Sequence, residues 1–134
     1  MKHLLLAFLL ASPALLAAEP PPPNDSPETM IQLKQEAASL EQQVKVSPKD
    51  TELYVKLGFT YARLRQADEA QRAFETAVTL DPKRAIAHYM LGLIYEKKGL
   101  RERAVTAWKA CLENTQDPRL RETAVRHLHH LSRD

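Results

Sequence analysis

The residues of this chain that come closest to a metal site are histidines near its carboxyl end. His127 and His130 are three positions apart, so on a helix they share one face and their imidazoles can meet. His129 points away from that face, and with His88 as the only other candidate the set lacks a third ligand of zinc quality. The pattern predicts solvated surface histidines. A weak copper or nickel site, or handling of a haem precursor, is the alternative.

The sequence also lacks the motifs that announce catalysis. It contains no glycine-rich phosphate loop, no Cys-x-x-Cys pair, no His-Glu-x-x-His and no nucleophile elbow. Asp68 and Glu69 are adjacent carboxylates, but they stand where a helix is expected to begin, and carboxylates there complement the helix dipole. We therefore expect no enzyme, no cofactor and no resident metal.

The charge balance argues against two classes of partner. The chain has 19 Lys and Arg against 17 Asp and Glu, which gives a net charge of +2. Bases and acids are interspersed, so no basic footprint for nucleic acid or for an anionic membrane is visible. The single cysteine, Cys111, cannot form an internal disulfide, and we expect it to be a small buried residue.

The helices that must position any site follow one sequence pattern, which occurs twice between residues 51 and 118. Each member of the second copy follows its counterpart by 34 positions, and a fixed period of this length marks an array of helix pairs. The first copy reads Tyr54, Leu57, Gly58, Tyr61, Ala70, Phe74, Ala77 and Pro82. The second copy reads His88, Leu91, Gly92, Tyr95, Ala104, Trp108 and Cys111.

This pattern resembles the tetratricopeptide repeat family over residues 40–131. The resemblance implies an all-α fold, a right-handed α-α superhelix with two helix pairs, 51–84 and 85–118. We expect helices at about 51–64, 67–80, 85–98 and 101–114. Gly58 and Gly92 lie within helices, where glycine costs about 1 kcal/mol relative to alanine. That cost predicts a close helix contact, with Ala70 and Ala104 opposite the two glycines.

Two flanking helices must close the core, because two repeats are fewer than such arrays usually need. Residues 28–48 carry an apolar stripe that matches the repeat only in part, which predicts a capping helix or a degenerate repeat helix. Residues 119–134 predict a solvating end helix with a polar outer face. At the turns, Gly99 suits a left-handed backbone, whereas Arg65 at the matching place predicts mild strain.

The first residues carry an export signal. A short apolar run ends in Ala17 and Ala18, which predicts a signal peptide over 1–18, cleaved after Ala18. The run is too short for a membrane span, although an uncleaved anchor remains the alternative. Residues 19–27 contain four consecutive prolines and predict an extended tether. We expect a periplasmic or secreted protein.

The family resemblance implies recognition of a protein or peptide on the concave face, which the first helix of each pair lines. Well-known members grip a terminal carboxylate there with Lys and Asn. Val55, Phe59 and Met90 occupy three of those places, so that clamp is absent. What remains is an apolar strip edged by bases. The site predicted by register consists of Val55, Lys56, Phe59, Arg63, Ile86, Tyr89, Met90, Leu93 and Lys97.

These observations predict a non-enzymatic adaptor that holds a partner protein or peptide, at an envelope assembly or secretion system. In one alternative the N-terminal helix covers the apolar strip. In another a second copy of the chain covers it, and the protein is a self-associating structural subunit. Metal or haem-precursor handling through the histidines is a third hypothesis.

Overall fold

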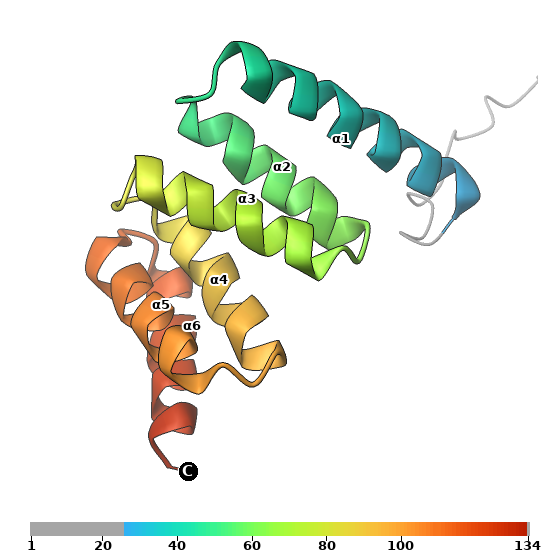
Figure 1. The fold of residues 1–134 in the computed structure, drawn as a ribbon. Helices are drawn as coiled ribbons and strands as arrows, with labels where there is room; N and C mark the ends of the chain where they lie inside the picture. Colours follow the sequence, from blue (N-terminus) through green and yellow to red (C-terminus); the bar gives the residue numbers. More distant parts are fainter. Residues whose placement is uncertain (1–25, 134) are drawn as a thin grey trace, which may run out of the picture.

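The computed structural model describes residues 26–133, and within them the chain is entirely helical. The signal peptide and residues 19–25 of the tether lie outside the described residues. Consecutive helices lie side by side, with α1 and α6 at opposite ends of the stack (Figure 1). None of the helices in this part of the chain has both the length and the hydropathy to cross a bilayer. The helices are α1 (Pro27–Val46), α2 (Thr51–Arg63), α3 (Ala67–Leu80), α4 (Ala85–Lys97), α5 (Arg101–Asn114) and α6 (Pro118–Ser132).

Side-chain caps explain where three of these helices begin. Asp50 accepts a hydrogen bond from the backbone N–H of Glu52, and Asp117 does the same for Arg119. Ser26 accepts from the N–H of Thr29, with Pro27 as the first residue of α1. Pro27 therefore belongs to the helix and not to the tether, because proline is favoured at the first helical position, where its missing N–H is not needed.

The two turns inside the helix pairs have the same backbone. Gly99 has φ of +73° and Arg65 has φ of +59°, so the expected left-handed residue is present at both. The N–H of the next residue closes each turn by donating to a tyrosine carbonyl, at 2.9 Å from Gln66 to Tyr61 and 2.8 Å from Leu100 to Tyr95. Arg65 holds a conformation that costs a non-glycine residue about 1–2 kcal/mol.

The two helical glycines face aromatic rings and not alanines, which corrects the sequence-based expectation. A Cβ on Gly58 would stand 2.7 Å from the ring of Phe74, and one on Gly92 would stand 2.6 Å from the indole of Trp108. Both rings are fully buried. The close approach is therefore a flat ring lying on bare backbone, and Ala70 and Ala104 are buried elsewhere in the same core.

The first helix has the register of a second helix of the repeat. The Tyr61 hydroxyl donates to Glu41 of α1, as the Tyr95 hydroxyl donates to Glu75 of α3 at 2.7 Å. Tyr61 and Tyr95 are 34 positions apart, and so are Glu41 and Glu75. The prolines that follow the two glutamates, Pro48 and Pro82, keep the same spacing. Pro48 accepts from Tyr54 at 3.0 Å, and Pro82 lies 2.7 Å from the imidazole nitrogen of His88. His88 thus replaces the aromatic residue without loss of the contact.

The last helix has the register of a first helix but ends the stack. Only Ala124 of α6 is fully buried, while Leu120, Leu128 and Leu131 pack on the core with part of their surface. Arg126 lies at the place of Gly58 and Gly92, and its side chain is exposed. A further ring could not lie flat on the backbone at that position, so α6 presents a polar end face.

Candidate functional site

The predicted site lies mainly on one open face of α2 and α4. Five of its apolar side chains are half-buried, and its three bases are exposed. The apolar members pack on the core with one side only, which leaves the other side open. We call the eight residues the inner strip: Phe59, Ile86, Tyr89, Met90 and Leu93, with Lys56, Arg63 and Lys97.

Val55 does not belong to this surface, and its assignment to the groove was wrong. Its side chain is 4% exposed and lies in the same core cluster as Phe74 and Ala87. Val55 stands four residues before Phe59, about 40° further round α2 at 100° per residue, and that shift turns it into the core. The register taken from the repeat placed both residues on one face, although the next helix pair covers Val55.

The N-terminal helix leaves the inner strip uncovered. Leu33, Ala37 and Leu40 of α1 pack against Leu57 and Leu64 of α2, in a separate core cluster. Those two leucines lie on a different side of α2 from Phe59, which belongs to the other cluster. Near the open face, Glu36 of α1 accepts a hydrogen bond from the buried Thr60 hydroxyl at 3.2 Å.

A polar network supports the strip from below. The Glu96 carboxylate accepts from the indole N–H of Trp108 at 2.7 Å and lies 2.6 Å from Nδ1 of His127. The imidazole of His127 stacks on the indole, with ring centroids 4.4 Å apart, and Tyr89 meets the same indole edge-on at 5.3 Å. This network joins α4, α5 and α6 under one end of the strip. Phe59 and Phe74 make another edge-on contact at the other end.

The network corrects the interpretation of His127 as a solvated surface residue. His127 is half-buried and stacked, whereas His129 and His130 are exposed. His88 lies instead in a pocket on the far side of α4, so the histidines do not converge. Within residues 26–133, no three His, Cys, Asp or Glu side chains are grouped as a metal site would require.

The electrostatic balance of the inner strip is positive. Glu52 forms a two-pronged ion pair with Arg84, at 2.7 and 3.1 Å, and Glu96 is engaged as described above. Lys56, Arg63 and Lys97 have no ion pair with any residue in 26–133, and all three are exposed. Glu52 and Glu96 are therefore already engaged by partners, whereas the three bases have no ion pair within residues 26–133.

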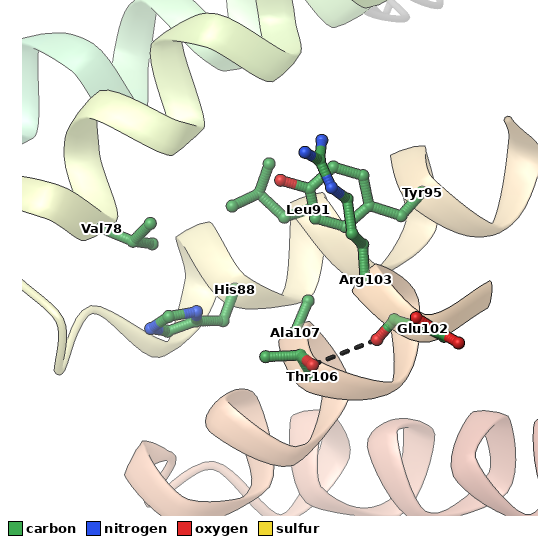
Figure 2. Close-up of a pocket in the computed structure, with 8 residues that line it drawn as sticks. All are labelled: Val78, His88, Leu91, Tyr95, Glu102, Arg103, Thr106 and Ala107. Atoms are coloured by element: carbon green, nitrogen blue, oxygen red, sulfur yellow. Dashed lines mark hydrogen bonds between the residues drawn. The ribbon is translucent and has the colours of Figure 1, made fainter. Parts of the chain in front are cut away.

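A pocket of about 420 Å³ lies on the face of α4 opposite the inner strip. Its lining residues His88 and Leu91 stand two residues before Met90 and Leu93, which places them about 200° round the helix. Leu91 and the Tyr95 ring form its apolar wall, and the Thr106 hydroxyl donates to the backbone carbonyl of Glu102 at 3.1 Å (Figure 2). The lining residues are Val78, His88, Leu91, Tyr95, Glu102, Arg103, Thr106 and Ala107.

This pocket was not predicted, but the 34-residue period explains it. The matching hollow of the first repeat is about 220 Å³, and there Arg72 lines the wall and pairs with Glu69 at 3.6 Å. Thr106 replaces Arg72 in the second repeat, and the smaller side chain leaves the pocket open. The lining holds one cation, Arg103, and one anion, Glu102, so its charge favours no class of ligand.

The pKa shifts of the described residues follow structural contacts. Burial, and the hydrogen bond to Glu41, raise the pKa of Tyr61 to about 12, and burial with the bond to Glu75 raises the pKa of Tyr95 further. The Lys98 ammonium, 2.6 Å from Asp68, lowers the pKa of that carboxyl. Burial raises the pKa of the Cys111 thiol, which keeps it protonated and unreactive. These groups hold helices together and do not face the inner strip.

Comparisons with known proteins agree with this architecture. Residues 55–115 match the family model of the tetratricopeptide repeat. Among solved structures, the chain is similar to the Sgt2 TPR domain from Aspergillus fumigatus. The two share 22% sequence identity over 81% of this chain and 84% of that one, with a TM-score of 0.57. At that identity the likeness shows the fold, and it confirms the α-α superhelix. No curated protein matches the chain.

Proposed function

Since this chain belongs to the tetratricopeptide repeat family, whose stacked helices serve as protein interaction modules, we propose that it is a non-enzymatic adaptor. Its inner strip holds a partner protein or peptide. The observation that carries the proposal is the inner strip itself, where five half-buried apolar side chains stand on an open face beside three exposed bases. Apolar side chains of this kind, gathered and rimmed by polar residues, mark interaction surfaces.

The support beneath the strip favours recognition over a mobile surface. Tyr89 rests on Trp108, which is itself held by Glu96 and His127, and Phe59 rests on Phe74. Anchors that are held rigid before binding lose less freedom when a partner arrives. A few such anchors usually carry most of the binding free energy.

The place of action follows from the export signal. A protein cleaved after Ala18 acts in the periplasm or outside the cell, at an envelope assembly or secretion system. Sequencing of the amino terminus in envelope extracts tests this part. We expect a mature chain that begins at Glu19, and a membrane-bound chain that retains Met1 would contradict the proposed location.

Binding on the strip is tested by adding a negative charge at its centre. Leu93→Glu and Met90→Glu should each weaken capture of the partner from envelope extracts by about 30-fold or more, since an anchor can carry 2 kcal/mol or more. Val125→Glu is the matched control, because Val125 is 51% exposed on the outer side of α6. Circular dichroism confirms that each variant is folded. If folded variants capture the same protein as efficiently as the unaltered chain, the strip is not the binding surface.

A further inference from the structure

We infer that the segment held on the inner strip carries several side-chain carboxylates beside its apolar residues. This inference rests on the proposed function. It adds the chemistry of the partner, which neither the repeat pattern nor the family match specifies.

The sign of the charge comes from which groups on this face are already paired. Lys56, Arg63 and Lys97 are exposed and unpaired among residues 26–133, while Glu52 is held by Arg84 and Glu96 by its two ring partners. Glu36 of α1, which accepts a hydrogen bond from Thr60 of α2, carries one further negative charge. The face therefore keeps an excess of positive charge, and carboxylates on the partner complement it.

The three bases are spread along the inner strip. Lys56 and Arg63 are seven residues apart on α2, about 10 Å along the axis at 1.5 Å per residue. Arg63 and Lys97 stand 34 positions apart, in the last turns of α2 and α4, so each repeat presents one base at the same place. An ion pair needs an approach of about 4 Å, so a segment that lies along the strip would pair with the spread bases through more than one carboxylate.

The position of two bases has a structural reason as well. Arg63 and Lys97 lie in the last turn of their helices, where a cation complements the helix dipole. That role uses the charge without neutralising it, because the interaction is with partial charges on backbone carbonyls. Lys56 is in the middle of α2, where the dipole offers no such reason for a base.

Displayed peptides test the inference without a known partner. Random 12-residue peptides, fused to a carrier so that no carboxyl terminus is free, are selected on the full protein. We expect recovered sequences that combine Asp or Glu with Leu, Ile or Phe. Synthetic amidated copies are then titrated against three proteins, at 50 and at 500 mM NaCl. These are the unaltered chain, the strip variant Lys56→Gln/Arg63→Gln/Lys97→Gln and the control variant Lys45→Gln/Lys109→Gln/Arg133→Gln.

The strip variant should bind about tenfold more weakly at 50 mM NaCl, since three exposed pairs contribute a few tenths of a kcal/mol or more each. Its affinity should change little with salt, whereas that of the unaltered chain should fall about tenfold. The control variant loses the same net charge from exposed positions on α1, on α5 and after α6, and should bind within twofold of the unaltered chain.

The outcomes separate the two proposals. Suppose that Leu93→Glu weakens binding of the recovered peptides. If those peptides carry no excess of acidic residues, or if the strip variant binds them as tightly as the unaltered chain does, the inference is wrong and the proposed function stands. If Leu93→Glu weakens the binding of none of the peptides, or if no peptide is recovered, the proposed function fails and this inference fails with it.

Discussion

Replacing Gly92 by alanine tests the packing on which the inner strip depends. The added Cβ would lie 2.6 Å from Cε2 and 2.7 Å from Cδ2 of Trp108. Ordinary contact begins near 3.4 Å, so the indole must move by about 0.8 Å. Trp108 has no free space to do so, because it is 0% exposed and lies against His127 and Tyr89.

Two effects of opposite sign decide the magnitude. Alanine gains about 1 kcal/mol over glycine inside a helix, whereas overpacking of a closed core costs about 1–3 kcal/mol. We expect the second effect to win, with a net loss of about 1 kcal/mol in the free energy of unfolding. For a domain of this size, that is a drop in melting temperature of about 4–8 °C.

The assay uses urea unfolding followed by circular dichroism, with emission from Trp108, the only tryptophan, as a second signal. Trp108→Leu should relieve the clash, so the double variant should be more stable than the sum of the single changes predicts, by at least about 1 kcal/mol. Gly99→Ala is the control. It meets no atom within 4 Å but holds φ of +73°, so any loss there should be insensitive to Trp108→Leu.

A stabilising Gly92→Ala would refute the reasoning. An increase of about 1 kcal/mol, with unchanged emission, would mean that the indole yields freely and that glycine is not required beneath it. Additive effects of Gly92→Ala and Trp108→Leu would likewise show that the two residues are not in contact.

Three further results are expected. His127→Gln should lower the free energy of unfolding by about 1–2 kcal/mol and shift Trp108 emission in equilibrium spectra, because the variant loses a ring stack and weakens the bond to Glu96. Tyr61 has a pKa of about 12 in the folded chain against 10.0 for the free group. Its contribution to stability is therefore complete below about pH 10 and is lost as pH rises toward 12, so Tyr61→Phe should flatten the alkaline decline seen in urea titrations. Addition of a chelator should leave helical ellipticity and melting temperature unchanged, and a large drop would revive the histidines as ligands.

The sequence was enough to predict the helices, since local rules place their ends. The caps at Asp50 and Asp117, the left-handed Gly99 and the three- and four-residue spacing of apolar side chains each act within one or two turns. The predicted ranges differ from the observed ones by a residue or so at most ends. The 34-residue period predicted the all-α fold, because a pattern that forms one pair of helices should form a second pair where it recurs.

Contacts between helices were harder to predict, because they depend on the crossing geometry of each pair. The partner of Gly58 is Phe74 and not Ala70, a difference of one helical turn along α3 that spacing on α2 cannot reveal. Val55 was placed on the open face because the register of one helix says nothing about what the following pair covers. His127 was misjudged for the same reason, since its stacking surface comes from α5.

The register of the two end helices allows the six helices to be grouped into pairs in a second way. Because α1 is a second helix and α6 is a first helix, the chain also divides into the hairpins α1–α2, α3–α4 and α5–α6. The tyrosine–glutamate bonds lie inside the first two of these hairpins. A duplicate of residues 51–84 could be inserted after Arg84. The new interfaces would then be of the kind that already joins α3 to α4, and α1 and α6 would keep their present neighbours. If the proposed function holds, the number of inserted helix pairs sets the length of the partner segment that the stack can bind.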